Sequence, residues 1–248
     1  MNTVEIIFSP TGGTEKAAHM ISGQWSESIV KIDLSDPSAA YSQYVINKDD
    51  QVLIAMPSFG GRAPAVAIER LKKITGNGAN CTIVCIYGNR AYEDTLVEME
   101  DAAKQCGFNV VAAVSAVAQH SIIPQYAANR PDASDEKQLA EFANRIAGKT
   151  EPVSSVPGNR PYKKAGGGGL VPKPSSNCVK CGVCADTCPV QAIDHKTFIA
   201  DSKKCISCMR CMKRCSYDAR KVNGALVSVA TMAIRKVCSV RKENELFL

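Results

Sequence analysis

Eight of the twelve cysteines in this 248-residue chain fall into two copies of one spacing. One copy runs from Cys178 to Cys188, the other from Cys205 to Cys215, and each reads C-x2-C-x2-C-x3-C. Three thiolates on a tight loop can bind three irons of a cubane, and in proteins with two such runs the fourth cysteine ligates the other run's cluster. The spacing therefore predicts two [4Fe–4S] clusters, one held by Cys178, Cys181, Cys184 and Cys215 and the other by Cys205, Cys208, Cys211 and Cys188.

Structural zinc is the alternative for such cysteines. Zinc takes four ligands, usually as two separated pairs, whereas here three cysteines crowd together before the fourth. The repeated pattern favours iron–sulfur clusters. A disulfide framework is not expected, because the first residues, MNTVEIIF, lack the features of a signal peptide. We expect a cytoplasmic protein whose other cysteines, Cys81, Cys85, Cys106 and Cys238, are unpaired.

The net charge of +6 is unevenly distributed along the chain. Residues 1–150 hold 13 basic and 17 acidic side chains, whereas residues 178–222 hold 9 and 4. An oxidised cubane with four thiolates carries a charge of about −2, so these basic residues partly offset the predicted clusters. Aromatic residues are sparse and no nucleic-acid motif is present, so no nucleic-acid partner is expected. No apolar run is long enough to span a membrane, so no membrane partner is expected either.

A loop of small and hydroxylated residues lies near the start of the chain. Residues 3–8 (TVEIIF) have the composition of a buried strand, S-P-T-G-G-T follows at 9–14, and a helical sequence comes next. A strand, a small-residue loop and a helix point backbone N–H groups at one spot, which can bind a phosphate. Neither a Walker A nor a Rossmann glycine pattern is present. The alternative is an ordinary turn with Thr14 as helix N-cap.

The alternation of strands and helices continues through residues 1–150. Further strands are expected at Ser28–Leu34, Gln51–Met56, Cys81–Tyr87 and Val110–Val117, and helices at Ala65–Ile74, Tyr92–Cys106 and Ser134–Ala147. This spacing predicts an α/β fold with a parallel sheet that is covered on both faces. Ligands of such sheets bind outside the carboxyl ends of the strands.

Three loops at these strand ends have unusual compositions. Residues 57–64 and 87–94 combine glycine with aromatic side chains, and residues 119–124 include His120. Glycine permits close approach of the backbone to a ligand, and aromatic rings can lie against a planar group. Together with the phosphate-type loop, these features predict a planar, phosphorylated cofactor, and flavin mononucleotide (FMN) fits.

On these motifs, residues 1–150 resemble a flavodoxin, and nearly the whole chain resembles the flavodoxin–ferredoxin fusion proteins of anaerobic bacteria and archaea. The resemblance implies a doubly wound five-stranded sheet of order 2-1-3-4-5 and a small α+β domain with two [4Fe–4S] clusters. It implies that the FMN phosphate lies on Ser9, Thr11, Gly12, Gly13 and Thr14. The remaining flavin contacts are expected at Pro57, Ser58, Phe59, Gly60, Gly61, Arg62, Tyr87, Gly88, Asn89, Tyr92 and His120.

Two departures from the family pattern stand out. The second cysteine run ends in Cys215-Ser216 where Cys-Pro is usual, which should alter local rigidity more than ligation. Trp25, the single tryptophan, comes too early in the chain to stack on the flavin. Phe59 and Tyr92 are therefore the candidates for that contact.

The sequence divides into four parts: 1–150, a Pro/Gly-rich linker at 151–177, the two-cluster domain at 178–222, and a C-terminal helix and tail at 223–248. We expect a flexible linker, most flexible at Gly166–Gly169, although residues 159–162 can pack on a domain. A helix is expected at Gly224–Val240, packed on the protein. The tail, Glu245–Leu248, is apolar enough to dock as well.

Two functions are consistent with these features. The first is an electron carrier that passes single electrons between two clusters and an FMN and links low-potential donors and acceptors in anaerobic metabolism. Its partners would be redox proteins, and a homodimer is left open. The alternative is an FMN-dependent oxidoreductase that uses NAD(P)H or a small acceptor, with the clusters as an internal relay. No Ser–His–Asp or Cys–His set is evident, so no catalytic residues are assigned.

Overall fold

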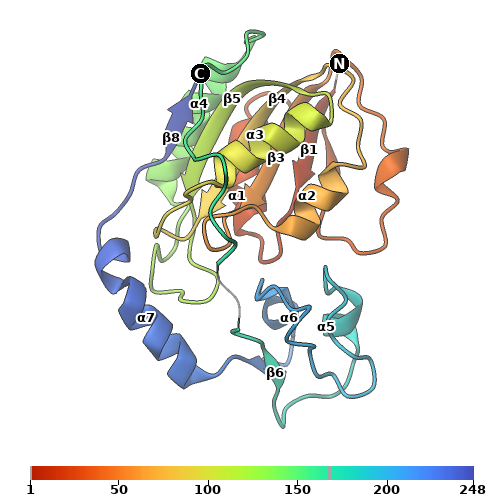
Figure 1. Cartoon of the computed structure of the whole chain (residues 1–248), viewed down its shortest axis with the longest axis vertical. Coiled ribbons are helices and arrows are strands. Elements are labelled where there is room, and N and C mark those ends of the chain that lie inside the picture. Colours follow the sequence, from red (N-terminus) through yellow and green to blue (C-terminus); the bar gives the residue numbers. More distant parts are fainter. Residues whose placement is uncertain (1, 167–168) are drawn as a thin grey trace.

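The central element is a sheet of five parallel strands with a sixth, antiparallel strand at one edge (Figure 1). The computed structural model describes residues 2–166 and 169–248. The strand order is β2-β1-β3-β4-β5-β8, so the predicted order 2-1-3-4-5 is confirmed, and it is the flavodoxin-like order. The strands are β1 (Thr3–Ile7), β2 (Ile29–Asp33), β3 (Gln51–Pro57), β4 (Asn80–Tyr87), β5 (Asn109–Val117) and β8 (Glu245–Phe247).

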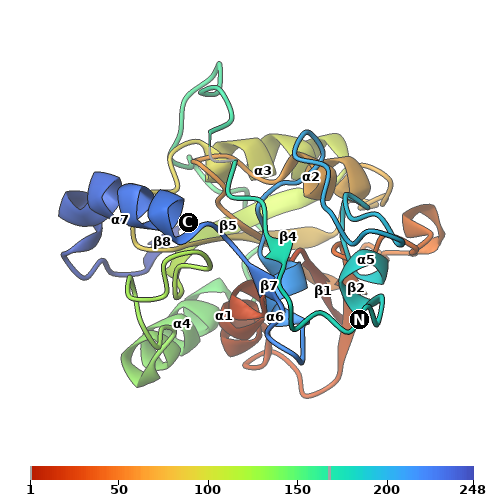
Figure 2. The same cartoon turned by 90° about the horizontal axis from the view of Figure 1, so that it is seen from below.

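Helices cover both faces of this sheet. The pair α1 (Gly13–Ser22) and α4 (Ala133–Ile146) packs on one face, and α2 (Ala65–Leu71) and α3 (Thr95–Gln105) on the other (Figure 2). The central strands are almost wholly buried and read as continuous apolar runs, because both of their faces meet helices. Two apolar cores result, one on each face of the sheet. A short 3₁₀ helix, Tyr41–Gln43, lies in the stretch between β2 and β3.

Helix α1 begins two residues earlier than in the alternative with Thr14 as the N-cap. Gly12, with φ of 92°, is the N-cap residue, and Thr14 already lies within the helix. A left-handed backbone there is inexpensive for glycine and strained for most other residues. The helix also ends before Trp25, whose indole Nε1 donates a hydrogen bond of 3.1 Å to Ala143 O on the neighbouring helix α4. Trp25 therefore has a structural role.

The cysteine-rich domain (residues 172–222) lies next to the carboxyl edge of the sheet (Figure 1). It contains a two-stranded ladder and two one-turn helices: β6 (Lys173–Pro174), α5 (Val183–Asp186), α6 (Arg210–Lys213) and β7 (Arg220–Lys221). Its small core includes Ala185, Cys188 and Ile193. Because β6 pairs with β7, the domain begins before the expected boundary at residue 178.

Much of the expected linker is bound to the sheet domain and is not a free tether. Val153 N donates to Val110 O at 2.8 Å, and the buried Asp94 carboxylate accepts hydrogen bonds from Asn159 N at 2.9 Å and Lys163 N at 2.7 Å. We call residues 153–163 the strap. Of the expected glycine hinge at 166–169, residues 167 and 168 lie outside the described part of the chain.

The C-terminal segment returns to the sheet domain. Helix α7 (Gly224–Cys238) packs Val227, Ala230 and Ile234 against the apolar side chains of the loop after β5. The tail then forms β8, which pairs antiparallel with β5 through Leu246 opposite Val114. Docking of the tail is thus confirmed, although its strand conformation was not expected. Among the described residues, no helix is long and apolar enough to cross a bilayer.

Candidate cofactor sites

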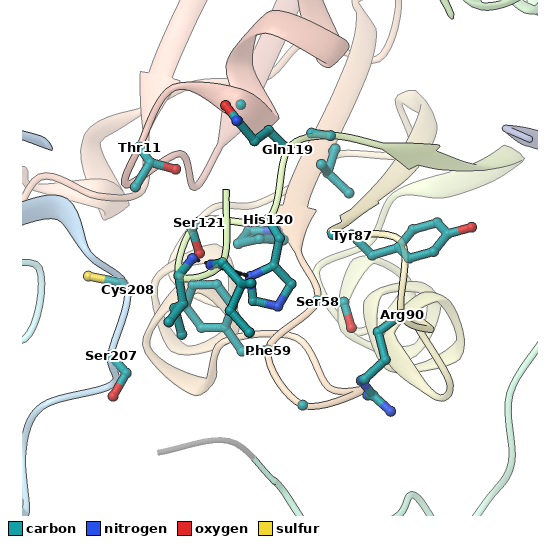
Figure 3. Close-up of a pocket in the computed structure, with 18 of the residues that line it drawn as sticks. Thr11, Ser58, Phe59, Tyr87, Arg90, Gln119, His120, Ser121, Ser207 and Cys208 are labelled. Atoms are coloured by element: carbon teal, nitrogen blue, oxygen red, sulfur yellow. Dashed lines mark hydrogen bonds between the residues drawn. The ribbon is translucent and has the colours of Figure 1, made fainter. Parts of the chain in front are cut away.

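A cavity of about 400 Å³ opens at the carboxyl edge of the sheet (Figure 3). The loops after β1, β3, β4 and β5 form most of its wall, as the fold class requires. Two further walls come from distant parts of the chain: Ile206–Cys208 of the cysteine-rich domain, and Ala230, Ala233 and Ile234 of α7. In Figure 3, Ser207 and Cys208 lie across the cavity from Tyr87 and Arg90. The volume lies in the range of small-molecule sites.

Most of the residues expected to contact the flavin line this cavity. They come from all four strand-end loops: Thr11, Gly13, Thr14, Pro57, Ser58, Phe59, Gly60, Tyr87, Gly88 and His120. The sequence placed them at one sheet edge, and the structure brings them together there.

Two residues of the expected phosphate loop do not line the cavity and instead shape the loop. Ser9 Oγ accepts a hydrogen bond of 3.0 Å from Glu15 N, and Ser9 N donates to Ser35 Oγ at 3.0 Å. Gly12 supplies the left-handed turn into α1. Within the described chain, the N–H groups of residues 11–14 have no protein acceptor. These donors and the helix N-terminus fit a phosphate group.

Four other expected flavin contacts are directed elsewhere by specific partners. Arg62 pairs with Glu98 at 2.7 Å and stacks over the Tyr162 ring of the strap. Arg62 thus links the sheet domain to the strap and does not line the cavity. Gly61 packs so tightly on Glu93 that an added Cβ would lie 1.6 Å from Glu93 Oε2.

Asn89 and Tyr92 stabilise the C-terminal segment instead of lining the cavity. Asn89 Nδ2 donates to Cys238 O at 2.9 Å and to Val240 O at 2.8 Å. Tyr92 packs edge-on against Tyr87 and donates its hydroxyl to Glu245 Oε2 at 2.7 Å. Tyr92 therefore does not line the cavity, whereas Phe59, the other aromatic candidate, does.

His120 is held as a neutral ring at the cavity wall. Its Nδ1 accepts hydrogen bonds of 3.2 Å from both Ile122 N and Ile123 N, which leaves the proton on Nε2. Burial, with a smaller contribution from the nearby charge of Arg90, lowers the pKa of His120 below 6.5. Gly88 allows this arrangement, because an added Cβ would come within 2.7 Å of the imidazole ring. The neutral ring can donate a hydrogen bond from Nε2.

Several wall residues were not expected from the sequence. Gln119, Ser121, Ile122 and Ile123 belong to a loop that was singled out only for His120, and Pro10, Ile86, Ala118 and Leu170 also contribute. Ile206–Cys208 and the α7 residues carry no local signal for flavin contact. They reach the cavity only because the C-terminal half folds back over the sheet edge.

The four cysteines assigned to the second cluster line one small cavity in the cysteine-rich domain: Cys188, Cys205, Cys208 and Cys211. Burial raises the pKa of the Cys208 thiol to about 12, and the backbone N–H of Arg210 partly opposes this. Among the described residues, no three potential ligands are close enough to hold one metal ion. A cubane places its four thiolates on four different irons, so its ligands stand farther apart than those of a single ion.

The cysteines of the first run form a more exposed group. Cys178 and Cys181 lie near Cys184: burial raises the pKa of the Cys184 thiol, Arg220 lowers it, and these two neighbouring thiols raise it further. Cys181 is exposed to solvent. Cys215 accepts a hydrogen bond of 3.3 Å from Ala219 N, and its ligation together with the first run stays a prediction.

The two runs have the same backbone conformation at equivalent positions. Left-handed residues occur two and four places after the first cysteine, at Lys180 and Gly182 in one run and Ser207 and Met209 in the other. Such turns direct successive N–H groups inward, where they can bind an anion. In both runs the fourth cysteine accepts an N–H···S bond of 3.3 Å from the residue four places later.

Three buried polar atoms have no hydrogen-bond partner in the described chain: Ser207 Oγ, Arg210 Nε and Arg220 Nε. All three belong to the cysteine-rich domain, and two lie within the second cysteine run. Buried donors without acceptors are rare in native proteins. Their concentration beside the cysteines fits groups that are negatively charged and accept hydrogen bonds, as iron–sulfur clusters do.

Comparisons with known proteins gave one family match and several remote structural similarities. Residues 172–194, which include the first cysteine run, match the family model "4Fe-4S binding domain". Among solved structures, flavodoxin 1 from Bacillus cereus is 17% identical, with a TM-score of 0.40 over 59% of this chain and 97% of that one. A Streptococcus pneumoniae TIGR4 flavodoxin is 17% identical, with a TM-score of 0.43 over 58% and 97%. No curated protein sequence matches the chain. These structural similarities are remote, so the fold assignment rests on the strand order.

Proposed function

We propose that this protein is an electron carrier that passes single electrons between an FMN at the sheet edge and two [4Fe–4S] clusters. One observation carries the proposal: Cys208, an assigned cluster ligand, lines both the flavin cavity and the cavity of the second cluster. A flavin can take up one or two electrons and a cluster one, so together they supply storage and a single-electron relay. The chain's task is to hold the three groups in contact.

The residues of the flavin cavity divide into three tasks. Thr11, Gly13 and Thr14 hold the phosphate at the start of α1, where N–H groups are free. Ser58, Phe59 and Tyr87 lie along the space for the ring, and the Nε2–H of neutral His120 offers a donor to it. The α7 residues and Ile206 exclude water from the side next to the second cluster.

The first cluster is the outer end of the relay, where a redox partner protein binds. Its ligand loop combines exposed Cys181 with the exposed apolar side chains of Val179 (54%) and Val183 (40%). Lys180 and Arg214 are exposed in the same domain. An apolar contact surface that includes positive charge suits an acidic partner. We place the partners among the low-potential donors and acceptors of anaerobic metabolism.

Anaerobic reconstitution tests the cofactor content directly. We expect about eight iron per chain together with about one FMN. A chain that folds and binds FMN but holds iron near zero would contradict the proposal. Titration with dithionite, followed by visible absorbance and EPR, should resolve two cluster signals in addition to the flavin.

Stopped-flow mixing separates the carrier from the oxidoreductase. Reduced ferredoxin, the carrier-type donor, should reduce the loaded protein rapidly, whereas NADH and NADPH should leave the flavin absorbance unchanged. Rapid flavin bleaching by either nicotinamide would favour the FMN-dependent oxidoreductase instead. Val179→Glu is a variant for the partner site: its negative charge should repel an acidic partner, so it should slow reduction by ferredoxin and leave iron and FMN content unchanged.

A further inference from the structure

Arg220 on β7 is one of the most deeply buried side chains of the molecule, with 1% of its surface exposed. Its guanidinium donates to Phe198 O at 2.5 Å and to Pro172 O at 2.7 Å, and Nε has no partner. Two backbone carbonyls satisfy part of its hydrogen-bonding capacity but none of its charge. Burying an unpaired cation costs several kcal/mol, so a compensating negative charge is expected nearby.

No carboxylate supplies that charge within the described residues, because none forms an ion pair with Arg220. The ionisable groups it does influence are cysteines from both predicted clusters. Burial raises the pKa of the Cys211 thiol, and Arg220 lowers it through its charge and through hydrogen bonding. For Cys184, burial again raises the pKa and the charge of Arg220 opposes it. Burial also raises the pKa of Cys205 and the charge of Arg220 lowers it, so the guanidinium acts on one ligand of the first cluster and two of the second.

The internal repeat shows that a cation is not required at this place in the fold. After the first run the chain reads Cys188-Pro-Val-Gln-Ala-Ile193, and after the second Cys215-Ser-Tyr-Asp-Ala-Arg220. Both segments make the same N–H···S bond to the fourth cysteine, and both continue into a short ladder or bridge. Ile193 is the buried apolar equivalent of Arg220. An apolar side chain is therefore compatible with this backbone position. The positive charge of Arg220 must have a reason other than packing.

We propose that Arg220 is the shared counter-ion of the two clusters and raises the reduction potentials of both. The proposal rests on the proposed function, because it needs both clusters. Each cluster accepts one electron from dithionite and no proton, so its charge with four thiolates goes from about −2 to about −3. A fixed cation in a region of low dielectric constant stabilises the more negative state, and this stabilisation favours reduction.

Two variants separate the charge of Arg220 from its hydrogen bonds. Arg220→Gln removes the charge and keeps amide donors for the two carbonyls, whereas Arg220→Lys keeps the charge. Lys203→Gln is the matched control, because it removes one positive charge two residues from Cys205 at an exposed position. All proteins are reconstituted anaerobically. Iron and sulfide are measured first, and EPR-monitored dithionite titrations follow at low and high salt.

We expect both midpoint potentials to shift to more negative values in Arg220→Gln and to remain near wild type in Arg220→Lys. The shift should be larger for the cluster that includes Cys211, and it should persist at high salt because the charge is buried. Lys203→Gln should show a smaller shift that salt removes. Loss of iron in the Gln variant alone would also support the counter-ion role.

Three outcomes would overturn the proposal. These are unchanged potentials in a fully loaded Gln variant, equal shifts in the Gln and Lys variants, and equal loss of iron from both. The last two would show that Arg220 acts through its shape and hydrogen bonds and not through its charge. Absence of iron from the wild-type protein is a different result, because it removes the proposed function itself.

Discussion

His120 shows how one side chain links the state of the flavin cavity to pH. The folded loop needs a free Nδ1 lone pair to accept from Ile122 N and Ile123 N. Protonation removes this acceptor, and burial lowers the pKa of His120 below 6.5. The open loop therefore binds more protons than the closed loop as pH falls below 6.5. Its closed form has full stability above that pH and loses stability as pH falls toward the lowered pKa.

We predict that the loop at residues 119–126 opens more readily at pH 5 than at pH 7.5. The protection factor of its amides should fall up to about tenfold for each unit by which the pKa is lowered. Hydrogen exchange followed by mass spectrometry, corrected for intrinsic rates, measures this. His120→Asn is the control, since its amide oxygen can still accept but does not titrate. Equal pH dependence in the two proteins would show that His120 is not the titrating group.

Among the larger elements, the strap shows what a single buried carboxylate can hold in place. Asp94 lies at the start of α3 but makes no capping bond to that helix. Its two oxygens instead accept N–H groups at both ends of residues 159–163. The hydrogen bond from Lys163 N is the main cause of its lowered pKa, so the strap should stay bound in neutral solution and detach only in strong acid.

We predict that Asp94→Ala releases the strap at neutral pH. Hydrogen bonds to a charged group contribute about 1.5–3 kcal/mol, so trypsin should cleave after Lys163 and Lys164 about ten- to a hundredfold faster. Limited proteolysis with mass detection of the fragments gives these rates. Asp49→Ala, at an exposed site, should cleave like the wild type. Equal rates for both variants would mean that other contacts hold the strap.

The comparison of sequence with structure separates local signals from long-range ones. Four of the five parallel strands, β1, β3, β4 and β5, were predictable because each is a buried run of five to nine residues with turn signals at its ends, whereas β2 is partly exposed along its length. The three residues of β8 were not predictable, since Glu-Leu-Phe acquires its strand conformation only by pairing with β5. The positions of Asn89 and Tyr92 outside the cavity were not predictable for the same reason, because their partners follow them by more than 145 residues.

Buried arginines are the second class of feature that the sequence could not reveal. Residues 178–222 contain seven basic residues besides Arg210 and Arg220. Because arginine is normally solvated, nothing in the sequence distinguishes these two from the others. Only the fold shows that these two are enclosed while Lys180 and Lys203 are exposed. The cluster ligands, in contrast, could be predicted without the fold, because each run of four cysteines lies within eleven residues of sequence.

At the scale of the whole molecule, arginines join the two domains. Arg70 of α2 donates to Leu34 O at 2.7 Å in its own domain and to Pro189 O at 2.6 Å beside the second-cluster cavity. Arg210 reaches in the opposite direction, to Ser9 O at 3.4 Å and Asp33 Oδ2 at 3.8 Å. These contacts hold Cys208 against the flavin cavity.

We predict that Arg70→Ala slows electron transfer between the flavin and the second cluster without changing cofactor content. Loss of its hydrogen bonds should weaken docking of the cysteine-rich domain by about 1–3 kcal/mol, and the rate should fall with the docked fraction. Flash photolysis with a flavin-selective reductant measures the internal rate. Arg235→Ala, on the exposed side of α7, should leave the rate unchanged. An unchanged rate in Arg70→Ala would show that other contacts, such as those of Arg210, are sufficient to hold the cysteine-rich domain in place.

The return of the chain through β8 has a kinetic consequence. The cysteine-rich domain departs from the sheet domain after the strap and rejoins it at β5, so both of its ends are fastened to the same sheet. A doubly tethered domain cannot diffuse away, and its effective concentration at the flavin edge is set by geometry and not by the amount of protein. For the proposed electron transfer between the two halves, we therefore expect a first-order rate that dilution of the protein leaves unchanged, whereas dilution would separate a free flavodoxin from a free ferredoxin.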